Sequence, residues 1–375
     1  MLAFLLSLFA IAFVAARMQP FVNRLRGVRT GPQLPQPARP LPSPDSANTE
    51  REDDGTAYKP TPVDVVVVRA LLSHGRKIPP DVVDVIFDFA EYWAHSSTEI
   101  DYSLERKSNL IIRGRSSQED RLLLRSFPVG LTSTEERADL AKVQRYDTKE
   151  STPRPLSREH PLSFFSRLAR YPTPTLVHPV RKIVFTIRSR DQGSGIPRTR
   201  DIYGQGWTWF EAGLERFDAD HECDDQCITD GRFLSPDSPG PRLPMCTLRP
   251  IYPTFSKRQR EETDESSDTK EGPPEADYVY DHGYLPVEER LIQRNRTRER
   301  AMMTHVVQWS WTDSTDPESA AGEELNSKGR GRSTGDGRFV RDLKVGDVVT
   351  IWGKAKFPAW VNHIEKVKID IYWAV

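Results

Sequence analysis

The stretch EKVKIDIYWAV, residues 365–375, alternates apolar and polar side chains along most of its length. Successive side chains of a β-strand point to opposite faces, so this alternation predicts a strand with one face in a core and one toward solvent. The inward set would be Val367, Ile369, Ile371 and Trp373. The outward set would be Lys366, Lys368, Asp370 and Tyr372.

The same pattern recurs in KIVFTIR, residues 182–188, where Ile183, Phe185 and Ile187 would share a face. Further strand-like stretches are GWTWFEAGLERFD (206–218), THVVQWSW (304–311) and GDVVTIWGKAKF (346–357). Most of these strands have no helical pattern between them, which favours antiparallel sheets packed face to face. The expected fold is mainly β: an antiparallel, jelly-roll-like β-sandwich with a small N-terminal helical element and long disordered segments.

Size and composition limit the function classes. The chain has 375 residues, enough for two ordinary domains, but only 37% are hydrophobic and 30 are proline. A core cannot run the full length of so polar a chain. The net charge of −1 gives no electrostatic reason to expect a nucleic-acid partner. Three cysteines do not make a disulfide framework, which indicates a reducing compartment.

The N-terminus is apolar and uncharged over residues 2–16. At ~1.5 Å per residue this helix would span about 23 Å, short of the ~30 Å bilayer core. The segment could be a membrane anchor or a cleaved signal peptide. A third possibility is that it is neither. The flank is rich in arginine and has no acid before Asp45, which favours an anchor with a cytosolic body. Secreted, cytosolic and mitochondrial locations are the alternatives.

Composition divides the chain into five segments. Residues 1–26 would be the anchor or signal segment, and 27–60 a proline-rich disordered linker. Residues 61–130 would form a helical hairpin plus short strands, and 131–180 a second linker. Residues 181–375 would be the β-sandwich domain, and the charged, low-complexity run at 256–277 a disordered insertion within it.

Several local expectations complete this picture. Thr61-Pro62 predicts the start of a helix, although the β-branched run at 65–68 admits a strand. NLIIRG and RLLLRSFPVGL, within 109–131, indicate a strand pair. PVEERLIQRNRTRERAMM (286–303) predicts a helix, and 313–336 predicts a loop. Gly346-Asp347 predicts a turn directly before a strand.

Several of these blocks together resemble a group of uncharacterised fungal proteins in which they occur in the same order. The blocks are RKIVFTIRSRDQG (181–193), GWTWFEAGLERF (206–217), LIQRNRTRERAMMTHVVQW (291–309), the run from Gly335 to Val375, and IPPDVVDVIFDFAEYWAHSS (78–97). The sandwich is also similar in shape to galactose-binding-like jelly rolls, and DVVDVIFDFA after a proline resembles the opening of an F-box. The group's resemblance implies no activity, because none is known for its members.

Asp191 and Gln192 lie where a strand ends. Their side chains can hold a loop by bonding backbone amides, and Gly193 permits a positive φ. Alternatively they form the rim of a ligand site, where a carboxylate and an amide would bind sugar hydroxyls. Trp207 or Trp209 would then stack on the sugar ring.

HECDDQC places His221, Cys223 and Cys227 close together, with Cys246 downstream. Zinc takes four nitrogen or sulfur ligands in a tetrahedral array, so these residues could hold one. The spacing is not that of a standard zinc knuckle. Ordinary loop thiols or a disulfide are the alternatives, and no other cofactor is expected.

Other polar residues have a structural and a functional interpretation. Glu211 and Glu215 could do acid–base work or could be salt-bridged. His305 and His363, beside aromatic residues, are expected to be satisfied sheet histidines. The cations in KGRGRSTGDG could touch phosphate or lie in a flexible loop; they are Lys328, Arg330 and Arg332. Asn295 heads a glycosylation sequon, which matters only in the secretory route.

These observations favour a non-enzymatic binding or adaptor protein, tethered to a membrane through residues 2–16. Its ligand would be a protein or a carbohydrate. The alternatives are a carboxylate- or metal-dependent hydrolase and an F-box-like ubiquitin-ligase adaptor.

Overall fold

The computed structural model describes residues 59–132, 149–169, 171–193, 202–204, 206–221, 245–258 and 278–375. The contacts divide the chain into two compact units, one ending at Ala94 and the other beginning at His95. The apolar start and most of the proline-rich linker lie outside the described residues, as do Cys223, Cys227 and most of the charged run at 256–277.

The first unit is helical over α2 (Pro62–Ala70), the π-helical turn η2 (Leu71–Gly75) and α3 (Pro80–Ala90). The Thr61 hydroxyl accepts from the Asp64 amide at 3.2 Å, and the Asp64 carboxylate accepts from the Thr61 amide at 2.9 Å. This reciprocal cap, with proline in the first turn, fixes where α2 begins. The helix prediction is confirmed, and the strand alternative for 65–68 is wrong.

No helix within the described ranges combines the length and the apolar character needed to span a bilayer. The apolar segment at residues 2–16 falls outside those ranges.

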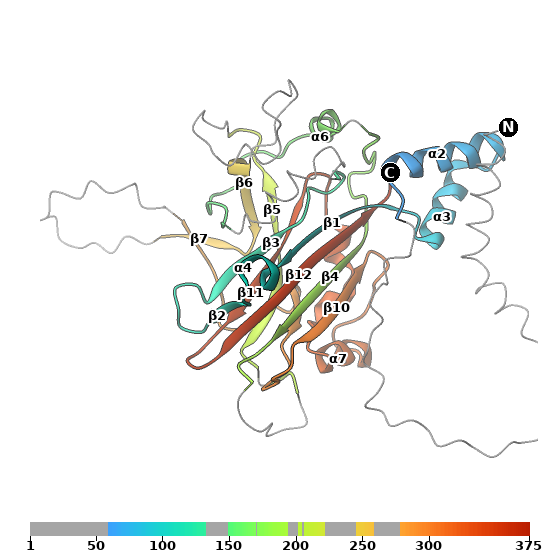
Figure 1. Cartoon of the computed structure of the whole chain (residues 1–375). Helices are drawn as coiled ribbons and strands as arrows, with labels where there is room; N and C mark the ends of the chain where they lie inside the picture. Colours follow the sequence, from blue (N-terminus) through green and yellow to red (C-terminus); the bar gives the residue numbers. More distant parts are fainter. Residues whose placement is uncertain are drawn as a thin grey trace, which may run out of the picture. The chain divides into compact units, whose positions relative to one another are not determined.

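The second unit contains two five-stranded sheets, and Figure 1 shows the first of them with β12 at its centre. Its order is β1-β12-β4-β10, with β2 also pairing to β12. The bounds are β1 (Ala94–Asp101), β2 (Leu110–Arg113), β4 (Val180–Arg190), β10 (Met303–Ser310) and β12 (Val361–Trp373). The registered pairs β12–β4, β12–β2 and β10–β4 are all antiparallel.

The second sheet has the order β3-β11-β5-β6, with β9 also pairing to β5, and its pairs are likewise antiparallel. Its strands are β3 (Asp120–Arg125), β5 (Thr208–Phe217), β6 (Leu248–Tyr252), β9 (Leu291–Arg294) and β11 (Val348–Ala355). A small antiparallel pair joins β7 (Phe255–Lys257) to β8 (Tyr278–Tyr280). The mainly β fold of antiparallel sheets is therefore confirmed.

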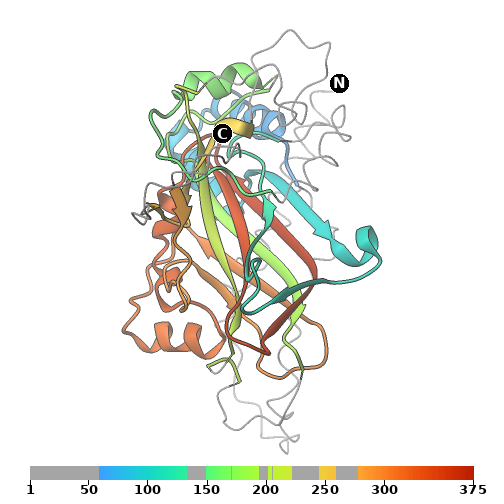
Figure 2. The same ribbon diagram turned by 90° about the vertical axis from the view of Figure 1, so that its left-hand side faces the viewer.

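Several short helices lie in the connections between the strands. They are α4 (Tyr102–Arg106), α6 (Leu162–Leu168), α7 (Ala320–Ser327) and α8 (Arg338–Arg341), with 3₁₀ turns η5 (Met245–Thr247) and η6 (Arg332–Asp336). Figures 1 and 2 both place α6 and α7 at opposite ends of the long strands. Helix α7 and turn η6 fall within 313–336, so the expectation of a loop throughout that segment is wrong.

The core lies between the two sheets. On β12 the four side chains expected to point inward are buried, and on β4 the three apolar ones are buried too; they are Val367, Ile369, Ile371, Trp373, Ile183, Phe185 and Ile187. A Cβ added to Gly353 of β11 would lie 2.8 Å from Ile112 on β2 and 3.1 Å from Ile364 on β12. The facing sheets therefore approach closely at this point, and glycine makes that approach feasible.

A buried polar network also ties the sheets together. The side-chain nitrogen of Asn295 donates to the Thr208 hydroxyl at 3.0 Å and to the Asn362 side-chain oxygen at 2.9 Å. The side-chain oxygen of Asn295 accepts from the Ser189 hydroxyl at 2.7 Å. Thr208 belongs to the second sheet, whereas Asn362 and Ser189 belong to the first. The sequon at Asn295 is thus in the core, closed to a glycan in this conformation.

Two expectations about elements are wrong. The segment 286–303 contains strand β9 and turns instead of a helix, because Leu291 and Ile292 are both buried where β9 pairs with β5. Strands β2 and β3 do not pair with each other; β2 joins β12 and β3 joins β11. The sheets consequently take strands from 94–125 as well as from 180–373.

Strand β5 is buried on both faces, contrary to the expected half-polar pattern. Tyr280, the last residue of β8, and His282 cover part of the outer face of the second sheet: their rings lie 5.5 and 5.1 Å from the Trp352 ring of β11. Tertiary cover of this kind leaves no periodic signal in the covered strand itself.

Candidate binding pocket

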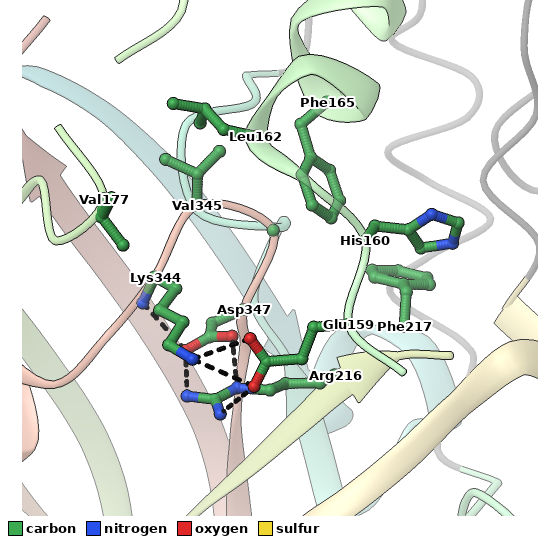
Figure 3. Close-up of a pocket in the computed structure, with 11 residues that line it drawn as sticks. Glu159, His160, Leu162, Phe165, Val177, Arg216, Phe217, Lys344, Val345 and Asp347 are labelled. Carbon is green, nitrogen blue, oxygen red and sulfur yellow. Dashed lines mark hydrogen bonds and ion pairs between the residues drawn. The ribbon is translucent and has the colours of Figure 1, made fainter. Parts of the chain in front are cut away.

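One pocket lies at the α6 end of the sandwich, where α6, the end of β5 and the turn before β11 meet (Figure 3). Its volume is about 170 Å³. The lining residues are Glu159, His160, Leu162, Phe165, Val177, Arg216, Phe217, Lys344, Val345, Gly346 and Asp347. Figure 3 shows the charged side chains gathered at one end and apolar ones, including Leu162 and Val345, at the other.

The turn at residues 344–347 builds one wall. The Asp347 amide donates to the Lys344 carbonyl at 3.1 Å, and the Asp347 carboxylate accepts from the Lys344 amide at 2.9 Å. Gly346 has φ +90°, a conformation that glycine adopts without steric cost. A Cβ at this position would also overlap the Phe165 ring. The predicted Gly346-Asp347 turn is confirmed, and glycine is needed there for two separate reasons.

Helix α6 supplies the apolar wall. Phe165 is buried, and its ring lies 6.4 Å from the ring of Phe217 at the end of β5. Both belong to a hydrophobic cluster that includes Leu248, Val345 and Val348, with Leu162 packed against it. Burial of this apolar face holds α6 on the sheet.

The segment before α6 carries Glu159 to the pocket mouth. Asp218, directly after β5, accepts from the Ser157 amide at 3.2 Å and the Arg158 amide at 3.4 Å. Residues 159 and 218 form an isolated antiparallel bridge, and the Ala219 amide donates to the Arg158 carbonyl at 2.8 Å. The backbone of this segment is therefore fixed without any contribution from the Glu159 side chain.

Four charged side chains form the polar end of the pocket. Arg216 bonds both Asp347 carboxylate oxygens, at 2.8 Å through Nε and 3.2 Å through Nη2. Its Nη1 donates to Glu159 Oε1 at 2.8 Å. The Lys344 ammonium donates to both Glu159 oxygens, at 3.0 and 2.7 Å. The two cations are thus bridged by Glu159, while Asp347 holds only Arg216 and the turn.

Burial and charge set the protonation of these groups. Burial raises the pKa of Asp347, and the Arg216 guanidinium opposes that shift. Partial burial also pushes the pKa of Glu159 upward, but the Lys344 hydrogen bond and the charge of Arg216 outweigh it and lower the pKa. Burial, and then the charge of Arg158, lower the pKa of His160. At neutral pH His160 is therefore uncharged, and Glu159 is ionised.

Asp191 and Gln192 hold a loop at the end of β4. Asp191 is buried; one carboxylate oxygen accepts from the Gly193 amide at 2.8 Å and the other from the Arg298 amide. The Gln192 side chain accepts from the Val361 amide at 3.5 Å. Gly193 has φ +67°, as the sequence suggested. These contacts correspond to the structural interpretation, and neither residue lines the pocket.

The two tryptophans differ in environment. Trp209 is fully buried, and its indole N–H donates to Glu211 at 2.7 Å, so it presents no ring face to a ligand in this conformation. Trp207 is half-buried against Phe357, with ring centroids 4.5 Å apart. Neither ring lies at the pocket.

The proposed zinc ligands are only partly within the described residues. His221 is exposed, and Cys246 is half-buried. Cys223 and Cys227 lie outside the described residues. Within the described ranges, no group of three or more histidine, cysteine or acidic residues is placed to hold a metal ion.

The paired carboxylates of β5 are salt-bridged. Glu215 takes two hydrogen bonds from Arg125, at 2.6 and 2.9 Å, and Glu211 lies 3.6 Å from the buried Lys354 ammonium. Lys354 in turn bonds Asp120 at 3.0 Å. The two glutamates therefore anchor β3 and β11 to β5.

The remaining candidates serve the fold. Burial lowers the pKa of His305 to about 4 and also lowers that of His363. His305 Nε2 has no hydrogen-bond partner among the described residues, so this histidine is not satisfied as expected. Three cations of 328–332 have protein partners: Lys328 pairs with Glu324, Arg332 pairs with Glu323, and Arg330 donates to the Val306 carbonyl.

Sequence reasoning did not single out Glu159, Arg216 or Lys344. They come from three segments far apart in the chain, and each is an ordinary charged residue where it stands. The usable signal was the turn at Gly346-Asp347, whose aspartate holds Arg216. Only the fold brings the other two to it.

The chain was compared with models of known protein families, and none matches it. No curated protein and no solved structure matches it either.

Proposed function

We propose that this chain is a non-enzymatic binding or adaptor protein whose β-sandwich takes a ligand in the pocket beside α6. The observation that carries the proposal is the juxtaposition of a small apolar wall with two cations held at fixed positions. Ligand sites are typically concave and mostly apolar, with a few polar groups that fix orientation.

The chemistry of the lining favours binding over catalysis. None of the described lining residues carries a hydroxyl or thiol nucleophile, and both lining carboxylates are engaged with Arg216. General acid–base catalysis requires a group that can exchange its proton near the working pH. Glu159 is held ionised by its cations, and Asp347 is enclosed in the turn, so neither is poised for that role.

The test is a ligand screen on the full chain, with binding detected by thermal shift and by NMR. The set should include glycans, short peptides and organic anions. Val345→Phe fills the pocket from its apolar side and is expected to abolish any protection. Leu176→Phe, an exposed neighbour outside the lining, is the matched control. Protection that survives Val345→Phe would refute the pocket as the binding site.

A second candidate function follows from the helical unit. Helices α2 and α3 expose several large apolar side chains: Val63, Val67, Val82, Val85 and Phe89. Phe89 is 85% exposed, and exposed apolar patches commonly mark sites of protein contact. An F-box-like role would have this unit recruit a ubiquitin-ligase core. Capture of that core by the full chain, lost in Phe89→Ser but kept in Leu104→Ser, would support it; no capture would exclude it.

The membrane tether is likewise a proposal, and it rests on the apolar residues 2–16. Removing residues 1–26 is expected to shift the protein from the membrane fraction to the soluble fraction. A full-length chain that already fractionates as soluble would refute the tether without touching the pocket.

A further inference from the structure

We propose that Glu159 is a built-in occupant of a carboxylate subsite formed by Arg216 and Lys344, and that the ligand of the pocket is a monocarboxylate bearing a compact apolar group. This inference rests on the proposed binding function and names its ligand class. The ligand's carboxylate would displace that of Glu159, and its apolar group would lie against Phe165 and Val345.

The Arg216 guanidinium and the Lys344 backbone are held without Glu159. Arg216 directs Nε and Nη2 to Asp347, whose side chain is only 3% exposed, and this leaves Nη1 facing Glu159. The backbone amide of Lys344 bonds the same aspartate. Removing the Glu159 carboxylate would therefore leave the Arg216 Nη1 donor in place and the Lys344 backbone held, and the Lys344 ammonium would lose both of its hydrogen bonds to Glu159.

Glu159 is placed to be exchanged. Its side chain is 40% exposed, and the backbone of its segment is held through Asp218. Exposed ion pairs add little net stability because water competes for both partners. The carboxylate can therefore leave the cations while residues 157–160 stay in position.

Charge selects the kind of anion. With Glu159 withdrawn, the positive charges of Arg216 and Lys344 face the single negative charge of Asp347, so one net positive charge remains. A monocarboxylate neutralises that charge and reproduces the planar geometry that Glu159 already adopts. A phosphate monoester carries nearly two negative charges and would meet Asp347 with a charge in excess.

The cavity limits the apolar group. Its volume of about 170 Å³ is close to that of an engineered cavity of roughly 150 Å³ that binds benzene. Phe165, Phe217, Leu162 and Val345 supply an apolar lining beside the cations (Figure 3). A phenyl or branched aliphatic group close to the carboxylate fits this description. It could belong to a free acid or to the C-terminal residue of a peptide.

The decisive experiment titrates the full chain with 3-phenylpropanoate, following binding by calorimetry and NMR. The matched neutral probe is 3-phenylpropanamide, and acetate lacks the apolar group. We expect the amide and acetate to bind at least about tenfold more weakly, a difference of about one logarithmic unit in Kd. A short peptide ending in Phe, compared with its C-terminal amide, tests the second source of the same chemistry.

Glu159→Gln is the diagnostic variant. When the Glu159 side chain occupies the subsite, the apparent affinity for a ligand is the intrinsic affinity multiplied by the fraction of molecules in which the subsite is open. Removing the Glu159 carboxylate should therefore tighten carboxylate binding about tenfold. Lys344→Gln should weaken it by a similar factor. Glu318→Gln makes the same charge change at an exposed site outside the lining and should leave the affinity unchanged.

The outcomes separate this inference from the proposed function. Suppose that ligands bind the parent chain and that Val345→Phe abolishes this binding. If the amide and the carboxylate then bind equally, or if Glu159→Gln does not change the affinity for the carboxylate, the carboxylate subsite is refuted and the binding function stands. If no probe binds the parent chain or the Glu159→Gln variant, both the carboxylate subsite and the proposed binding function are refuted.

Discussion

Gly346 shows how tightly one residue can constrain the pocket. Its backbone conformation at φ +90° forms the turn that carries Asp347 toward Arg216. The missing Cβ leaves room for the Phe165 ring, which closes the apolar wall. A single glycine therefore couples the charged end of the site to its apolar end.

Gly346→Ala is expected to destabilise the fold by about 1–3 kcal/mol, because a non-glycine residue at this φ is strained and its Cβ would also displace Phe165. Chemical denaturation of parent and variant measures the loss. Gly283→Ala is the matched control, since a Cβ there meets only ordinary contacts. Equal stability of Gly346→Ala and the parent would show that the turn does not have this conformation.

His305 predicts a pH dependence of stability. Burial, followed by the charge of Arg330, lowers its pKa to about 4 from an unfolded value of 6.5. Between these values the unfolded chain binds a proton that the folded chain excludes, so stability falls as the pH drops from 6.5 toward 4. The full loss is on the order of 3 kcal/mol.

His305→Phe should reduce the slope of this part of the profile, as measured by denaturation at pH 7, 6 and 5. His282, whose pKa burial also lowers to about 4, contributes part of the slope that remains. His221→Phe removes an exposed histidine and should leave the slope unchanged. A parent-like slope in His305→Phe would assign the acid sensitivity to other groups.

At the scale of elements, the strands with one covered face were predictable and the others were not. Alternation alone identified the inward side chains of β12 and β4, because their outer faces remain partly open to solvent. Strand β5 is covered on both faces, and β9 lies in a run whose charges suggested a helix. Strand pairing and the packing of other segments on the sheet determine the structure of both β5 and β9. Both depend on residues that are distant in sequence.

Trp373→Ala tests the role of β12. The side chain is fully buried at the end of the strand, and truncating a buried tryptophan typically costs about 3–5 kcal/mol. That is a large share of the ~5–15 kcal/mol by which a domain is usually stable, so we expect aggregation or loss of a cooperative melt. Lys366→Ala, on the outward face, removes only a partly exposed ion pair to Glu99 and should change little. A parent-like melt for Trp373→Ala would exclude its side chain from the core.

At the scale of the molecule, the pocket is a product of the fold. Glu159 precedes α6, Arg216 lies one residue before the end of β5 and Lys344 precedes β11, so the site exists only when three separate segments meet. The sequence predicted the sandwich that brings them together. The sequence could not reveal the site, because no local spacing links these three residues. The candidates that the sequence did single out, such as Asp191 and Glu215, hold loops and strands in place.

The same interdependence predicts which fragment folds. The sequence placed the sandwich in residues 181–375, but that fragment lacks β1, β2 and β3. Without β3 the edge of β11 loses its partner, and so does the edge of β12 that pairs with β1 and β2. Three consecutive buried leucines, Leu122–Leu124, are lost as well. An exposed strand edge beside an opened core promotes aggregation, so residues 181–375 should be insoluble or unfolded.

The fragment 95–375 retains every described strand, beginning one residue into β1, and should give a dispersed NMR spectrum and a cooperative melt. Gel filtration and circular dichroism of the two fragments decide the matter. A folded, monomeric 181–375 would mean that the two sheets close without β1–β3. The pocket would not survive in that fragment, because α6 and Glu159 precede it, and binding studies therefore require the longer chain.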